Sequence, residues 1–148
     1  MDSKATVLVG PIETLEKEAL TSLYNAVGWS VYTQDPTVLI RAIEGSDFVV
    51  EARAKGTLVG LARAISDDTS IVYIQDILVH PDHQGQGLGK RLVQAILQRY
   101  DHVRQKVLLT DNRPEQIAFY ESLAFHNTRN LVNTPLNAFV RIEGQELS

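Results

Sequence analysis

Residues 76–91 hold the side chains and spacing most suggestive of chemistry. An apolar strand pattern ends near Val79, and three glycines then fall within five residues, at Gly85, Gly87 and Gly89. A pattern of apolar residues with helical spacing follows directly. Glycine lets backbone N–H groups approach a ligand closely, and the start of a helix adds unpaired N–H donors and a partial positive charge. This stretch therefore predicts a binding site for a phosphate-like anion.

Two common phosphate-binding motifs do not fit this spacing. A nucleoside-triphosphate loop needs a glycine five residues before its Gly-Lys-Ser/Thr, but Gln84 and Arg91 occupy the two outer positions. A dinucleotide fingerprint needs a third glycine three residues after the second, where this chain has Lys90 or Leu92. Both alternatives are excluded.

The remaining pattern, Gln84-x-x-Gly87-x-Gly89 between a strand and a helix, resembles the pyrophosphate-binding motif of the GNAT superfamily of acyl-CoA-dependent N-acetyltransferases. Residues 119–125, Phe-Tyr-Glu-Ser-Leu-Ala-Phe, are similar to a second segment of that family. With the order of elements, the resemblance covers nearly the whole chain. It implies an α/β fold with a mixed, mostly antiparallel sheet flanked by helices, in one domain spanning residues 1–148.

The resemblance also implies a binding site for acetyl-CoA as co-substrate. The backbone of Leu78 and Val79 would pair with the pantetheine arm. The pyrophosphate would be held by backbone N–H groups of the following loop and helix start: Gln84, Gly85, Gln86, Gly87, Leu88, Gly89 and Lys90. The side chains of Lys90 and Arg91 either neutralise the phosphates or simply form the solvated face of the helix.

An asparagine commonly contacts the pantetheine in this family, seven residues before the tyrosine of the second segment. Arg113 occupies that position here, and Asn112 lies one residue earlier. One extra residue in the turn would restore Asn112 to this role. A second departure is Ala124, which replaces the usual glycine after the helix, where a positive φ is awkward for alanine.

The chemistry implied is direct attack of an amine on the acetyl thioester. Tyr120 matches the family's tyrosine acid, which protonates the departing thiolate; the alternative is a core tyrosine. Strand alternation places Ile74, Asp76 and Leu78 on one face and Gln75 on the other, unless a bulge changes the parity. Asp76 is the predicted base, with a purely structural carboxylate as the alternative, and Gln75 could instead orient a water.

The elements that position these residues follow from periodicity. Strands are predicted at 6–9, 48–52, 58–65, 71–79 and 106–110, with one or two more within 125–142. Helices are predicted at 12–27, 35–43, 88–100 and 115–123. Lys55-Gly56 and Ser66-Asp67-Asp68 separate the central strands as hairpin turns, so these strands should be antiparallel neighbours.

Composition narrows the class of protein. The 148 residues carry a net charge of −4, which disfavours nucleic acid as a partner. The chain has no cysteine, so thiolate metal sites and acyl-cysteine intermediates are excluded. His80 and His83 lack an evident third ligand, and no metal site is predicted. No membrane span is expected, and residues 1–5 do not resemble a secretory signal, so a cytoplasmic location is predicted.

The sequence therefore predicts an N-acetyltransferase that moves an acetyl group from acetyl-CoA to a primary amine of a small molecule or peptide. Two alternatives stay open: a non-catalytic acyl-CoA-binding or sensing module, and an acetyltransferase acting on protein N-termini or lysines. A homodimer is also left open. Trp29 is predicted to be a core residue, with a place in the acceptor pocket as the alternative.

Overall fold

The computed structural model describes residues 7–148. The interpretation of residues 1–5, and Thr6 of the first predicted strand, lie outside the described residues. The described residues form two compact units, the first up to Leu109 and the second from Thr110.

The first unit is built on a five-stranded sheet in which neighbours in sequence are neighbours in space. Its strands are β1 (Val7–Pro11), β2 (Phe48–Ala54), β3 (Thr57–Ser66), β4 (Ile71–Val79) and β5 (Gln105–Leu108). The first four strands pair antiparallel, and β5 pairs with β4 in parallel. The predicted α/β class with a mostly antiparallel sheet is confirmed. So are the two hairpins, the first turning at Lys55 and Gly56, both with positive φ, as a type I′ turn requires.

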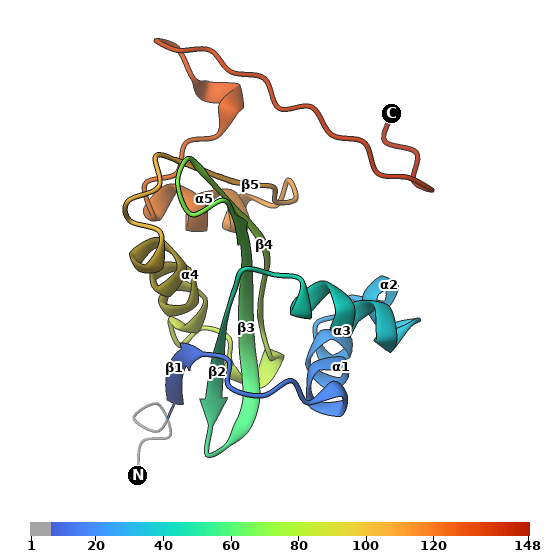
Figure 1. Ribbon diagram of the computed structural model, residues 1–148. Helices are drawn as coiled ribbons and strands as arrows, with labels where there is room; N and C mark the ends of the chain where they lie inside the picture. The colour runs from blue at the N-terminus through green and yellow to red at the C-terminus, as the bar shows by residue number, and fades with distance from the viewer. Residues whose placement is uncertain (1–6) are drawn as a thin grey trace. The chain divides into compact units, whose positions relative to one another are not determined.

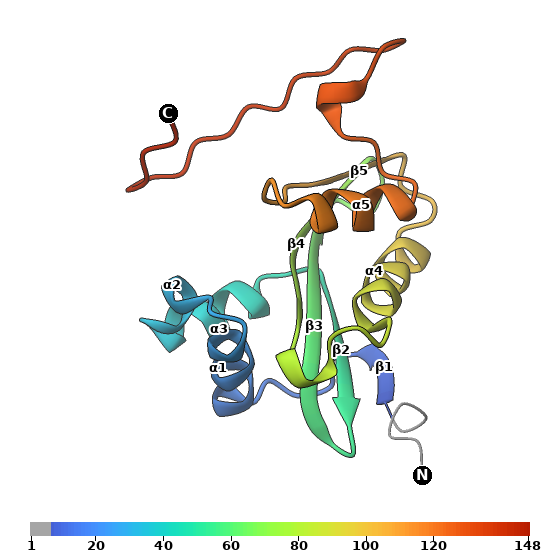
Figure 2. The same ribbon diagram turned by 180° about the vertical axis from the view of Figure 1, so that it is seen from behind.

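Helices cover both faces of this sheet (Figures 1 and 2). The helices α1 (Lys17–Ala26), α2 (Ser30–Thr33) and α3 (Pro36–Glu44) lie on one face, and α4 (Leu88–Arg99) lies on the other. The sequence signals for α3 are confirmed, because Asp35 accepts a hydrogen bond from the Thr37 N–H at 3.1 Å and Pro36 begins the helix. The four-residue helix α2 was not predicted, since it is too short for a periodic pattern.

A bulge in β4 changes which face its side chains reach. Ala62 pairs with Ile77 and Ala64 with Ile74, so two residues of β4, Gln75 and Asp76, lie opposite the single residue between those alanines. Asp76 and Leu78 face α1 and α3, whereas Ile74 shares the α4 face with its partner Ala64. The uninterrupted alternation expected from sequence is therefore wrong for Ile74.

The second unit contains α5 (Pro114–Ser122) and the short 3-10 helix η3 (Thr128–Asn130). The predicted strands within 125–142 are wrong: the described residues after Asn130 form no strand, and Phe139 is 93% exposed. A strand is stabilised by the ladder it shares with a partner, so an apolar alternation alone does not make one.

Candidate active site

The central feature of the first unit is an open backbone edge along the second half of β4. Strand β5 pairs only with Ile71 to Ile74, and no strand within residues 7–148 pairs with the rest of β4 on that side. The His80 N–H donates to the Val59 carbonyl at 2.8 Å. Because the backbone direction alternates along an antiparallel ladder, Leu78 also turns its N–H and C=O toward β3. Ile77 and Val79 turn theirs to the open edge.

The predicted pair of pantetheine-contacting residues is therefore corrected in one member. Val79 lies as expected, but the backbone groups of Leu78 are taken up by β3, and Ile77, which was not predicted, faces the open edge instead. The Gln84 side chain donates from Nε2 to the Val79 carbonyl at 3.0 Å, which ties the loop to the end of the strand. At Val79 the N–H remains for a ligand.

Directly after this edge the chain forms a glycine-rich turn that leads into the start of α4. Gly85 and Gly87 have φ of +77° and +78°, and a Cβ on either would meet no atom within 4 Å, so backbone conformation rather than crowding requires glycine. The first intrahelical bond joins the Arg91 N–H to the Gly87 carbonyl, which leaves the N–H groups of Leu88, Gly89 and Lys90 without intrahelical acceptors. The first turn of α4 has no acidic residue. This geometry fits a pyrophosphate.

The two basic side chains of this turn behave differently. The Arg91 guanidinium donates from Nη2 to the Val7 carbonyl at 3.2 Å, so it fastens β1 to α4. The Lys90 side chain is exposed. Of the two side chains considered for phosphate neutralisation, Arg91 is thus already engaged by the protein.

Asp76 lies at the bulge of β4 and is 2% exposed. Its Oδ2 accepts a hydrogen bond from Arg63 Nε at 2.7 Å and one from the Tyr24 hydroxyl at 2.8 Å. Its Oδ1 accepts one from the Tyr32 hydroxyl at 3.2 Å. Burial first, and then the Asp76 charge, raise the pKa of Tyr24 well above its ordinary value, so this hydroxyl stays a donor.

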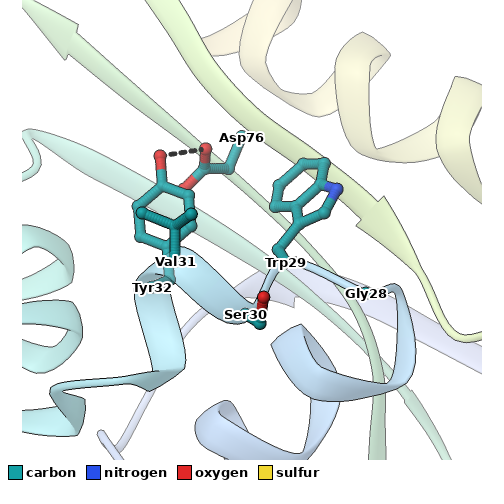
Figure 3. Close-up of a pocket in the computed structure, with 6 residues that line it drawn as sticks. All are labelled: Gly28, Trp29, Ser30, Val31, Tyr32 and Asp76. Carbon is teal, nitrogen blue, oxygen red and sulfur yellow. Dashed lines mark hydrogen bonds between the residues drawn. The ribbon is translucent and has the colours of Figure 1, made fainter. Parts of the chain in front are cut away.

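A cavity of about 390 Å³ opens beside this carboxylate. Its wall is formed by the end of α1, by α2 and by β4: Gly28, Trp29, Ser30, Val31, Tyr32 and Asp76. Figure 3 shows the Tyr32 hydroxyl directed at the Asp76 carboxylate, with the Trp29 ring beside them. Trp29 lines the cavity and also packs on the core cluster. Its place in an acceptor pocket stays a prediction.

In the second unit, Tyr120 lies on the last turn of α5. The helix ends in a Schellman motif: the Phe125 N–H donates to the Tyr120 carbonyl and the Ala124 N–H to the Glu121 carbonyl, both at 3.1 Å. Ala124 has a φ of +67°, so the alanine does adopt the left-handed conformation that favours glycine. Burial, followed by the charge of Asp111, raises the pKa of Tyr120 to about 12.

Asn112 belongs to the same unit, in the turn before α5. Its Oδ1 accepts a hydrogen bond from Arg129 Nη1 at 3.2 Å. Its predicted contact with pantetheine stays a prediction. Within residues 7–148, no group of three His, Cys, Asp or Glu side chains is placed to hold a metal ion.

The family profile described as "Acetyltransferase (GNAT) family" matches residues 12–125. This chain belongs to the GNAT acetyltransferase family. A relative named uncharacterized N-acetyltransferase ycf52, from Gracilaria tenuistipitata var. liui, is 35% identical over 113 residues, 72% of this chain and 59% of the relative. Its counterpart from Pyropia yezoensis is 30% identical over 114 residues, 72% of this chain and 62% of the relative. The chain thus spans about three fifths of the length of these curated relatives.

Solved GNAT structures share the fold of this GNAT chain. A GNAT family acetyltransferase from Streptococcus pneumoniae has a TM-score of 0.77 at 26% identity, covering 94% of this chain and 99% of that one. A protein titled putative acetyltransferase, from Deinococcus radiodurans, has a TM-score of 0.75 at 21% identity, covering 97% and 92%. No helix within residues 7–148 is long and apolar enough to cross a membrane.

Sequence reasoning missed three residues of this GNAT site: Tyr24, Tyr32 and Arg63. They lie 52, 44 and 13 positions from Asp76, on three different elements. None belongs to a motif, and the spacing of Tyr24 reads as an ordinary core position of an amphipathic helix. Only the fold brings them to one carboxylate.

Proposed function

We propose that this GNAT chain is an acetyl-CoA-dependent N-acetyltransferase acting on a primary amine. One observation carries the proposal: the open edge of β4 leads directly into the unpaired N–H groups at the start of α4, and the same strand supplies a buried carboxylate at the wall of a cavity. An extended ligand that ends in a pyrophosphate would run along this edge. An amine in the cavity would meet its other end.

The cofactor-binding groups follow from this arrangement. The backbone of Ile77 and Val79 would pair with the amide groups of pantetheine, as an added strand pairs with a sheet edge. The N–H groups from Gln84 to Lys90 would hold the pyrophosphate. Asn112 is kept as a proposed pantetheine contact.

The reaction needs a base and an acid. The amine nitrogen attacks the thioester carbonyl carbon, the C–N bond forms, and the C–S bond breaks. We assign the proton lost by the amine to Asp76 and the proton gained by the thiolate to Tyr120. A hydroxyl whose pKa lies near 12 is protonated at neutral pH, as an acid must be before it donates.

The acceptor is proposed to be a small amine or a peptide amine. A relative from Glycine max, 38% identical over 90 residues, is named histone acetyltransferase TAP1, so lysine peptides belong among the candidates. A relative from Arabidopsis thaliana is named as chloroplastic, whereas this chain's cytoplasmic location stays a prediction.

The test is a panel of amines, including lysine and N-terminal peptides, assayed for CoA release against a control without acceptor. Release that depends on an amine supports the proposal. Measurable CoA binding with no release for any amine would instead indicate the sensing module.

The acid is tested by Tyr120→Phe, with Tyr100→Phe as the matched control at a buried tyrosine of the first unit. We expect Tyr120→Phe to lower kcat about a hundredfold. The Kd for CoA should stay unchanged, and so should kcat for the control. Equal kcat for Tyr120→Phe and the parent enzyme would remove Tyr120 from the mechanism.

The anion site is tested by Gly87→Ala, with Gly144→Ala as control because both glycines have a φ near +80° and open space at Cβ. Both variants carry the same strain, but only Gly87→Ala distorts the start of α4. We expect it to raise the Kd for CoA about tenfold, the equivalent of about 1.4 kcal/mol. An equal effect of the two variants would count against a pyrophosphate site at α4.

A further inference from the structure

We infer that the hydroxyl of Tyr32 relays the acceptor's proton to Asp76, which makes Tyr32 a catalytic residue of this enzyme. The inference rests on the proposed function. It concerns how the proton travels between the cavity and a carboxylate that is almost fully buried.

The two oxygens of Asp76 are not equivalent. Oδ2 already accepts from Arg63 Nε at 2.7 Å and from the Tyr24 hydroxyl at 2.8 Å. Oδ1 accepts only the longer bond, from the Tyr32 hydroxyl at 3.2 Å. A carboxylate oxygen has two lone pairs, so Oδ2 is saturated and Oδ1 is the oxygen that can take a proton.

The Tyr32 hydroxyl stands between Oδ1 and the cavity. It donates to Asp76 and accepts from Gln75 Nε2 at 3.2 Å, and a hydroxyl has a second lone pair left to accept a further hydrogen bond. Tyr32 itself lines the cavity and is only partly buried (Figure 3). An amine held there can therefore donate to Tyr32 while Tyr32 donates to Asp76.

Tyr24 donates to the other oxygen, Oδ2, and does not reach the cavity. It is 0% exposed and is not part of the cavity wall. With Arg63, which is 6% exposed, it fixes the orientation of the carboxylate. Tyr24 and Arg63 are positioning residues. The remaining ionisable side chain near this group is Tyr73 of β4 itself, whose pKa is raised by burial first and then by Tyr32 and Asp76.

Two protons move in the relay. The amine's N–H bond breaks as its proton bonds to the Tyr32 oxygen, and the original Tyr32 proton moves to Asp76 Oδ1. The amine loses one proton, Tyr32 is unchanged, and Asp76 becomes a neutral acid. Once the product leaves, Asp76 returns the proton through the same hydroxyl to water, which restores the ion pair with Arg63.

The experiment compares Tyr32→Phe with Tyr24→Phe, since each removes one hydroxyl from one oxygen of Asp76. Single-turnover rates are measured with the best amine of the panel in mixtures of H₂O and D₂O. Two protons in flight give a curved dependence on the deuterium fraction in the parent enzyme. Tyr32→Phe should lower the rate about a hundredfold and make the dependence linear, with the KM for acetyl-CoA unchanged. Tyr24→Phe loosens the carboxylate that Tyr24 holds and should lower the rate by about tenfold at most, but it should keep the curvature.

A parent-like rate and curvature in Tyr32→Phe would overturn the relay, as would equal losses in both variants. Gln75→Met is a second variant at an exposed position that removes the donor to Tyr32. We expect about a threefold lower rate, and an unchanged rate would also count against the relay. If the parent enzyme acetylates no amine, the proposed function fails. If it is active and Tyr32→Phe matches it, only the relay fails.

Discussion

Two helix ends in this protein are built on the same local plan. Two residues beyond the end of each helix, Gly28 after α1 and Ala124 after α5 take the left-handed conformation, each with the two backbone bonds of a Schellman motif. In both, a tyrosine on the last turn packs edge-to-face on the aromatic residue after the cap. The ring centroids are 5.9 Å apart for Tyr24 and Trp29, and 6.1 Å apart for Tyr120 and Phe125.

The tyrosines nevertheless differ in what surrounds them. Tyr24 is fully buried and donates to Asp76, whereas the Tyr120 hydroxyl has no hydrogen-bond partner within residues 7–148. The cap residues differ too, since Gly28 takes its φ of +81° without strain and Ala124 does not take +67° so freely. The motif thus sets where a tyrosine ring lies, and tertiary partners decide whether its hydroxyl is structural or available.

The largest loss of stability should come from removing the guanidinium charge of Arg63, which pairs with the buried carboxylate of Asp76. Arg63→Met leaves Asp76 buried without its cation, and we expect a loss of about 3–5 kcal/mol in the free energy of unfolding. Urea denaturation measures it. Arg113→Met is the control near α5: its pair with Asp111 is more than half exposed on both sides, so the expected loss is below about 1 kcal/mol. Similar losses of stability in Arg63→Met and Arg113→Met would contradict the difference between the buried and the exposed ion pair.

The next largest difference in stability is expected between the two tyrosine variants. Tyr24→Phe removes a hydrogen bond to a buried carboxylate and should cost about 1.5–3 kcal/mol of stability. Tyr120→Phe removes no such bond and should change stability by less than about 0.5 kcal/mol, while its effect on kcat is large. Chemical denaturation of both variants tests the pair. A destabilised Tyr120→Phe would mean that its hydroxyl is structural after all.

Substitutions at the two helix caps should change the free energy of unfolding in opposite directions. Gly28→Ala forces alanine to a positive φ and should cost about 1 kcal/mol. Ala124→Gly relieves that strain, partly offset by the entropy of glycine in the unfolded chain, and should gain about 0.5 kcal/mol. Thermal melts, with hydrogen exchange of the α5 amides, measure both. Effects of the same sign would show that the two caps are not equivalent.

The smallest expected effect is that of moderately alkaline pH on Tyr120. Burial raises its pKa from about 10 in the unfolded chain to about 12 in the fold, so the fold favours the neutral form. That contribution to stability is complete below pH 10 and is lost as the pH rises toward 12. An ultraviolet difference titration of the parent enzyme against Tyr120→Phe should show this tyrosine ionising late. Ionisation near pH 10 would contradict its burial.

Local sequence signals predicted several turns and helix caps of this protein correctly. The positive φ of Gly85 and Gly87, the cap formed by Asp35 and Pro36, and the hairpin at Lys55-Gly56 are each confirmed, because each depends on backbone conformations that neighbouring residues set by themselves. The family followed from such motifs. The predicted strands beyond residue 125 failed because a strand needs a partner.

What the sequence determined was therefore the glycine-rich turn before α4 and the elements around it, since backbone geometry is encoded locally. The tertiary structure decided the rest. The pairing of β4 with β3 turned Ile77 rather than Leu78 to the open edge and brought Arg63 to Asp76. The packing of α1 and α2 on the sheet brought Tyr24 and Tyr32 to the same carboxylate. Hydrogen bonds between residues 13 to 52 positions apart leave no periodic trace in the chain, because only folding makes those residues neighbours.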